Sequence, residues 1–160
     1  MKKYIPNTIT CCNLISGAIA TGLAFEGSYK CAMLMIILGA VFDFFDGMSA
    51  RLLHVSSSIG KELDSLADDI TFGLAPSAIL FSLLKEMSYP YGMTSLQIYV
   101  PYVAFLISAF SALRLAKFNL DDRQSTSFIG VPTPANALFW ASLIAAFPKL
   151  ASYAEWIPFV

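Results

Sequence analysis

Apolar residues along the chain fall into long runs that short polar segments separate. Each run is about 20 residues long, which is the length a helix needs to cross roughly 30 Å of hydrocarbon. The pattern predicts five membrane-spanning helices, at residues 8–25, 32–50, 64–85, 97–117 and 133–152. We therefore expect an all-α fold, a polytopic transmembrane helix bundle.

The composition supports this interpretation. Of the 160 residues, 57% are hydrophobic and 13% are charged, whereas soluble domains are near half apolar and a quarter charged. Lys2 and Lys3 resemble the start of a signal peptide, but the apolar run that follows has no small-residue cleavage site. The length predicts one domain, residues 1–160, and nothing in the sequence indicates a nucleic-acid partner.

The basic residues predict an orientation in the membrane. If the N-terminus is cytoplasmic and five spans alternate, Lys30, Lys85 and Lys149 lie outside. The cytoplasmic side then holds Lys2, Lys3, Arg51, Lys61, Arg114, Lys117 and Arg123. Positive charge favours the cytoplasmic side. We expect a multi-pass protein of the cell (inner or plasma) membrane with its N-terminus inside.

Five acidic residues occupy the facing ends of the second and third predicted spans: Asp43, Asp46, Asp64, Asp68 and Asp69. An ionised carboxylate in a membrane segment costs about 2.5–3.5 kcal/mol on insertion scales. Asp43 and Asp46 are three apart, and Asp64 and Asp68 are four apart, so each pair shares a helix face. Four converging carboxylates repel one another unless cations lie among them. All-oxygen ligands favour Mg²⁺, Mn²⁺ or Ca²⁺.

Two other interpretations of these acids need weighing. Salt bridges to Arg51 and Lys61 would leave most of the negative charge uncompensated, and a proton or cation transporter also uses intramembrane acids. However, Gly47, Ala50 and Gly60 leave bare helix surface beside the acids, as close contact with a nucleotide or diphosphate requires. The Arg51 guanidinium has the shape to bind phosphate oxygens. This combination favours metal-dependent phosphoryl transfer.

The run Asp43-x-x-Asp46-Gly47-x-x-Ala50-Arg51, eight residues, Gly60-x-x-x-Asp64-x-x-x-Asp68 resembles the motif of the CDP-alcohol phosphatidyltransferases at every fixed position. The resemblance implies a bundle of usually six transmembrane helices, often a homodimer, in which an alcohol displaces CMP from a CDP-linked lipid. It also implies that the four motif aspartates hold Mg²⁺ or Mn²⁺, as two ions, and that Asp68 is the catalytic base. The residues implied to border the nucleotide and diphosphate are Asp43, Asp46, Gly47, Ala50, Arg51 and Gly60. Asn13, one turn into the first span, either reaches the nucleotide or holds helices together.

The likeness extends to the phosphatidylserine synthase branch of this family. The resemblance is found in four segments: Pro6-Asn7-x-x-Thr10-x-x-Asn13, residues 60–68, residues 114–119 and Phe128-x-Gly130-x-Pro132-x-Pro134. This implies CDP-diacylglycerol and L-serine as substrates. Serine needs a cation for its carboxylate, and Arg114, Lys117 and Asn119 end the fourth predicted span on the side of the aspartates.

Other roles for these residues stay open. Arg114 and Lys117 also suit plain membrane anchoring. A glycerol 3-phosphate or inositol phosphate acceptor would need a cluster of basic residues, which Arg114, Lys117 and Arg123 provide in part. The segment from Ala154 to Val160 looks like the opening of a further span, so we expect either a missing C-terminal helix or a short family member.

Overall fold

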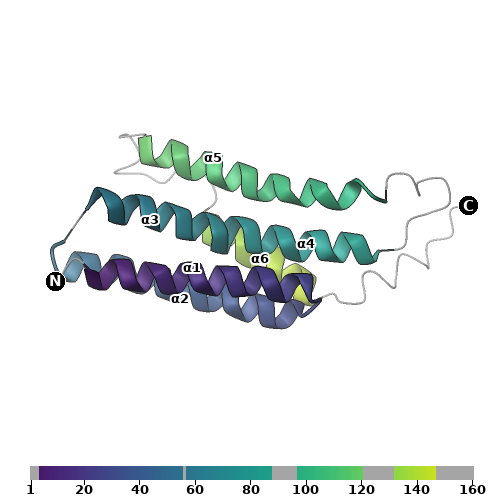
Figure 1. The fold of residues 1–160 in the computed structure, drawn as a ribbon, viewed down its shortest axis with the longest axis horizontal. Helices are drawn as coiled ribbons and strands as arrows, with labels where there is room; N and C mark the ends of the chain where they lie inside the picture. The colour runs from purple at the N-terminus through teal and green to yellow at the C-terminus, as the bar shows by residue number, and fades with distance from the viewer. Residues whose placement is uncertain (1–3, 56, 88–96, 121–131, 147–160) are drawn as a thin grey trace, which may run out of the picture.

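The structure is a computed structural model that describes residues 4–55, 57–87, 97–120 and 132–146. Every described element is helical (Figure 1), which confirms the all-α prediction. The elements are α1 (Tyr4–Phe25), α2 (Tyr29–Leu52), α3 (Ser58–Asp68), the π-helix η1 (Asp69–Leu74), α4 (Ala75–Glu86), the 3₁₀-helix η2 (Val100–Phe105), α5 (Leu106–Leu120) and α6 (Thr133–Ala146). The segments α3, η1 and α4 follow one another directly and form one continuous helix.

Within the described residues, four helical segments are long and apolar enough to cross a membrane: Tyr4–Phe25, Tyr29–Leu52, Ser58–Glu86 and Val100–Leu120. They confirm four of the five predicted spans and identify an integral membrane protein. The fifth prediction, residues 133–152, coincides with α6 as far as Ala146, and its remainder lies outside the described residues, as does the segment 154–160. The third span begins earlier than predicted, because the Ser57 hydroxyl caps α3 by accepting the Gly60 N–H at 3.0 Å.

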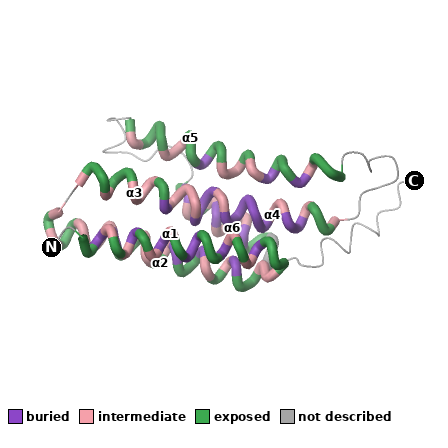
Figure 2. The backbone as a smooth tube through the Cα atoms, in the orientation of Figure 1, coloured by how far each residue is buried: buried purple, intermediate pink, exposed green. Residues whose placement is uncertain are grey.

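The continuous helix α3–η1–α4 is the centre of the bundle. It packs against α1 and α2 on one side and against α5 on another, while α6 contacts both α2 and α4 (Figure 1). Figure 2 shows buried residues concentrated in η1 and α4, whereas α5 is largely exposed. The N-terminus, the connection between α2 and α3, and the C-terminal end of α5 all lie at the same end of the bundle (Figure 1).

Small residues allow the helices to approach closely at the centre. Much of the core is alanine, with Phe72, Ile36 and Ile79 as its largest apolar side chains. A methyl group on Gly17 would lie 2.6 Å from the Thr71 Cα, and one on Gly39 would lie 2.5 Å from the Thr71 Cγ2. Close packing of small residues drives helix association in lipid. Both α1 and α2 therefore meet η1 at Thr71.

The π-helix explains how the central helix passes a proline. Pro76 has no N–H, and in a regular α-helix its ring would clash with the carbonyl one turn earlier. The turns of η1 just before it are wider, and the Ala75 N–H donates to the Ile70 carbonyl five residues back. The Ser77 hydroxyl donates to the Gly73 carbonyl at 2.6 Å. The wider turns of the π-helix thus accommodate the proline within one continuous helix.

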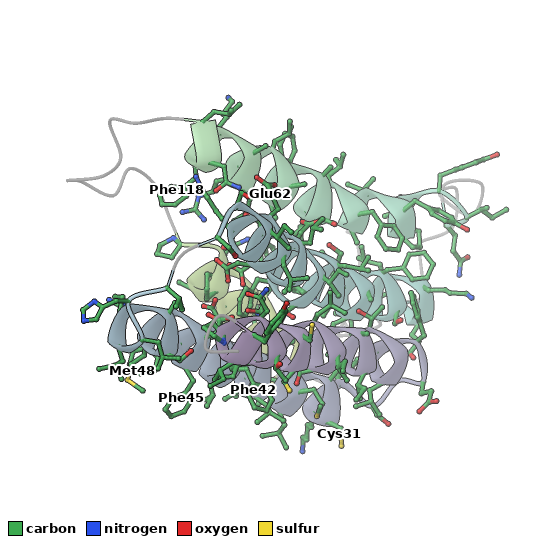
Figure 3. The ribbon with its side chains drawn as sticks, turned by 60° about the vertical axis from the view of Figure 1, so that its left-hand side comes forward. Cys31, Phe42, Phe45, Met48, Glu62 and Phe118 are labelled. Atoms are coloured by element: carbon green, nitrogen blue, oxygen red, sulfur yellow. The ribbon has the colours of Figure 1, made fainter. Side chains whose placement is uncertain are left out.

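Large apolar side chains cover the outside of the bundle. Phe45 and Met48 lie along the outer edge of α2 (Figure 3). Phe44 and Phe110 are 61% and 66% exposed. A soluble domain would not leave so many apolar side chains in contact with water. Lipid is the solvent that suits this surface.

Candidate metal and nucleotide site

Carboxylates from two neighbouring helices converge near the short α2–α3 connection. Asp43 on α2 and Asp64 and Asp68 on α3 can each present one oxygen, and these three oxygens lie within 4.8 Å of one another. Oxygens around a single Mg²⁺ are separated by about 3–4 Å, because each lies near 2.1 Å from the ion. Small side-chain movements would therefore let these three residues share one divalent cation.

Buried oxygens without partners support this fit. Asp64 Oδ1 and Asp46 Oδ2 are buried and accept no hydrogen bond from the described residues. A buried charged oxygen with no partner is costly, and a divalent cation would compensate both. The donor set consists of oxygen alone, which is typical of Mg²⁺ and Mn²⁺ sites. The cluster is thus chemically suited to hold a divalent metal.

Asp46 lies in the wall of an adjoining cavity. The cavity has a volume of about 350 Å³, and its wall includes Asp46, Gly47, Ala50, Gly60 and Asp64. Its size is near the lower end for small-molecule pockets. The structure thus brings three of the four expected metal ligands into one cluster and places the fourth in this cavity, which shares Asp64 with the cluster.

The N-terminal half of α1 forms another part of the cavity wall. Pro6, Asn7 and Thr10 line it, and Asn13, which is fully buried, donates from Nδ2 to Asp68 Oδ1 at 3.2 Å. Polar residues three apart share a helix face. In the sequence, Asn7 and Thr10 stood out only as part of the likeness to the phosphatidylserine synthases and were given no place at the site. Their spacing within an otherwise apolar span was the signal that could have found them.

Asn13 joins α1 to the central helix at two points. Its side chain bonds Asp68, and its backbone carbonyl accepts the Thr71 hydroxyl at 3.0 Å. It does not line the cavity among the described residues. Of the two roles that the sequence left open for Asn13, these contacts favour the link between helices. That link also orients Asp68.

Arg51 lies on the exposed surface of α2. Its Nε donates to the Gly47 carbonyl of its own helix at 3.1 Å, and it is absent from the described cavity wall. The sequence predicts this side chain beside the diphosphate; in the structure Arg51 is exposed, and its Nη2 would lie 3.9 Å from a methyl group on the cavity residue Gly47. Lys61 of α3, which sequence reasoning considered only as a salt-bridge partner, lines the cavity instead.

The three predicted acceptor residues lie in the last turns of α5. Asn119 contacts α3 through its side chain, which donates to Ser65 Oγ at 2.8 Å, and through its carbonyl, which accepts the Lys61 ammonium at 3.2 Å. Arg114 is partly exposed and Lys117 is exposed. The structure therefore places these three residues at the metal-cluster end of the bundle, where Asn119 joins α5 to α3.

Asp69 is not one of the three residues of the carboxylate cluster. A methyl group on Gly73 would lie 2.6 Å from Asp69 Oδ1 and 3.2 Å from the Cβ of Ser111 on α5. Asp69 Oδ1 is buried and has no hydrogen-bond partner among the described residues. Asp69 Oδ1 therefore lies next to Gly73, the residue at which η1 approaches α5.

Comparisons with known proteins show the family of this chain. The family model described as CDP-alcohol phosphatidyltransferase matches residues 3–160, so the chain belongs to the CDP-alcohol phosphatidyltransferase family. It is 39% identical over 136 residues to a CDP-diacylglycerol–serine O-phosphatidyltransferase of Bacillus subtilis, covering 82% of this chain and 70% of that protein. No solved structure matches the chain.

Two further relatives extend the comparison. A CDP-diacylglycerol–serine O-phosphatidyltransferase of Mycobacterium leprae is 33% identical over 96% of this chain and 50% of its own length. An archaetidylserine synthase of Methanothermobacter thermautotrophicus is 30% identical over 92% of this chain and 64% of its own length. The chain thus spans between half and about two thirds of these relatives.

Proposed function

We propose that this chain transfers the phosphatidyl group of CDP-diacylglycerol to the hydroxyl of L-serine, which forms phosphatidylserine and releases CMP. The observation that carries the proposal is the carboxylate cluster of Asp43, Asp64 and Asp68, which opens beside a cavity walled by glycine and alanine. The names of the relatives support a donor of the CDP-diacylglycerol type and serine as acceptor.

The proposed reaction is an in-line displacement at phosphorus. The serine oxygen forms a bond to the phosphorus that carries diacylglycerol, and Asp68 takes the hydroxyl proton. The bond from this phosphorus to the CMP oxygen breaks, and its electron pair leaves with CMP. Asn13 holds Asp68 in position through the 3.2 Å hydrogen bond. Asp43, Asp64 and Asp68 would hold Mg²⁺ or Mn²⁺, with Asp46 beside them for a second ion; bound metal neutralises charge on the diphosphate.

The cavity suits the nucleotide end of the donor. Gly47 faces open space, since a methyl group there would meet only the Arg51 Nη2 at 3.9 Å. Gly60 is closely packed, because a methyl group there would lie 2.9 Å from Ser57 Oγ and 3.1 Å from Asn7 Oδ1. In this proposal cytidine and diphosphate occupy the cavity, and the acyl chains remain in lipid between helices.

The proposed orientation places the site on the cytoplasmic side. Arg51, Lys61 and Lys117 lie at the end of the bundle that holds the metal cluster, and Lys30 and Lys85 lie at the other end. This distribution follows the positive-inside rule. Serine would then enter from the cytoplasm and the lipid donor from the inner leaflet. The substitutions Lys30→Cys and Lys117→Cys test this orientation. A membrane-impermeant thiol reagent added to intact cells should label the cysteine at position 30 and not the one at position 117.

For the acceptor, Arg114 is the proposed partner of the serine carboxylate, with Lys117 and Asn119 at the same end of α5. We further propose that residues 1–160 form one catalytic domain and that it acts as a homodimer, a state that light scattering in detergent would measure. The support for the dimer is the family resemblance.

The deciding experiment is an acceptor screen with labelled CDP-diacylglycerol and Mg²⁺ or Mn²⁺. Serine, glycerol 3-phosphate, inositol phosphate and choline are offered separately, and release of CMP and labelled lipid is measured. We expect release with serine and none after chelation of the metal. Release only with a phosphorylated acceptor would keep the chemistry and replace the acceptor. No release with any acceptor would refute the proposal and would favour the alternative of a cation transporter.

A further inference from the structure

The cavity beside the metal cluster has a single basic residue in its described wall, Lys61. Asp46 and Asp64 share that wall, so an anionic ligand that enters meets carboxylates as well. A metal compensates charge on one side of such a ligand. A cation in the cavity wall would compensate it on the other side.

Arg51 is exposed and is absent from the described cavity wall. Its Nε donates to the Gly47 carbonyl of its own helix. Lys61 lies in the part of the wall that α3 provides, one residue after Gly60 and three before Asp64. Its flexible four-carbon stem carries the ammonium several ångströms out from the α3 backbone.

A closed set of hydrogen bonds positions the Lys61 ammonium. Lys61 Nζ donates to the Asn119 carbonyl at 3.2 Å, Asn119 Nδ2 donates to Ser65 Oγ at 2.8 Å, and Ser65 Oγ donates to the Lys61 carbonyl at 3.2 Å. The carbonyls at the C-terminal end of α5 attract a positive charge. An ammonium has three N–H donors, so two remain for a ligand. Figure 3 shows this end of the bundle, with Glu62 of α3 and Phe118 of α5 near the junction.

We propose that Lys61 binds the diphosphate of the CDP-linked donor with these two N–H groups, and that Asn119 is a positioning residue that holds Lys61 from α5. The inference rests on the proposed function for the identity of the donor. It gives Asn119 a role different from direct contact with serine. It also explains why two residues on different helices, 58 positions apart in sequence, are joined at the cavity.

The test compares Lys61→Met with Lys85→Met in the full chain. Both lysines are exposed and lie at opposite ends of the same continuous helix. CDP affinity is measured in detergent with Mg²⁺, because CDP carries the diphosphate and needs no acceptor. A hydrogen bond to a charged group supports an expected weakening of about 10-fold for Lys61→Met, with Lys85→Met unchanged. Lys61→Arg should recover most of the affinity, and Asn119→Ala should lose about 2- to 4-fold.

Other outcomes separate the two proposals. If the wild-type chain binds CDP and Lys61→Met binds it equally well, the role of Lys61 is refuted and the proposed reaction stands. If Lys61→Met raises the KM for serine and leaves CDP affinity and the KM for CDP-diacylglycerol unchanged, Lys61 is an acceptor residue and the inference is wrong. If the wild-type chain binds no CDP, the proposed donor fails and the inference fails with it. Equal thermal unfolding temperatures for the two methionine variants exclude misfolding as the cause of a loss.

Discussion

The contact between α1 and η1 at Gly17 makes a sharp prediction about both stability and activity. A methyl group on Gly17 would lie 2.6 Å from the Thr71 Cα and 2.9 Å from its Cβ. Thr71 is fully buried, and η1 is itself packed against α5 through Gly73. The backbone of η1 therefore has no free space into which it can withdraw. Gly17→Ala should force α1 and η1 apart.

The chain offers a matched control in the same helix. Gly22 of α1 has no atom within 4 Å of the position where its methyl group would lie. Both substitutions gain up to about 1 kcal/mol of helix propensity, so their difference isolates the clash. Overpacking a well-packed core costs about 1–3 kcal/mol. For a chain of this size, each kcal/mol shifts the unfolding temperature by about 2–4 °C.

We therefore expect Gly17→Ala to unfold about 3–10 °C below Gly22→Ala in the same detergent. Activity should fall too, because Asn13 lies one turn from Gly17 and bonds both Asp68 and Thr71. Displacing a catalytic group by about 1 Å can cost on the order of 100-fold in rate, so CMP release should drop about 10- to 100-fold in Gly17→Ala. Equal unfolding temperatures and equal rates for the two variants would show that α1 and η1 are not in backbone contact.

Three further changes test the site. Asp68→Asn should lower CMP release by about two to four orders of magnitude and leave CDP affinity within about 3-fold, since the amide preserves the shape of the side chain; loss of folded protein would indicate a structural role instead. Arg114→Ala should raise the KM for serine more than the KM for CDP-diacylglycerol, and no change in either constant would identify an anchoring residue. Asp69→Asn should raise the unfolding temperature by about 2–4 °C, because it removes an unpartnered buried carboxylate oxygen; a large fall in turnover would give Asp69 a part in the reaction.

The bundle itself was largely readable from the sequence. The solvent of a transmembrane helix is lipid, so the length and apolar character of each run predict the span almost without reference to other parts of the chain. Four spans follow the predicted runs. The beginning of α3 was misjudged because Ser57 and Gly60 form a cap in a polar segment, where hydropathy carries no signal.

The site could be predicted from the sequence only in part. The spacing of Asp43, Asp64 and Asp68 was enough to predict that carboxylates from two helices would converge, because helical periodicity fixes which residues share a face. Periodicity does not determine which way each helix turns about its axis against its neighbours. That rotation set Asp46 and Lys61 into the described cavity wall and left Arg51 outside it.

The sequence by itself therefore determined that this is a membrane helix bundle with an acidic, small-residue motif of the CDP-alcohol phosphatidyltransferases. Only the tertiary structure decided which partner each polar side chain meets. Asn13 bonds Asp68 and Thr71, and Asn119 bonds Ser65 and Lys61, across 54 to 58 residues of sequence. Such contacts depend on close packing at glycines such as Gly17 and Gly73. The distance of closest approach between two helices is a property of both surfaces together, so neither segment reveals it alone.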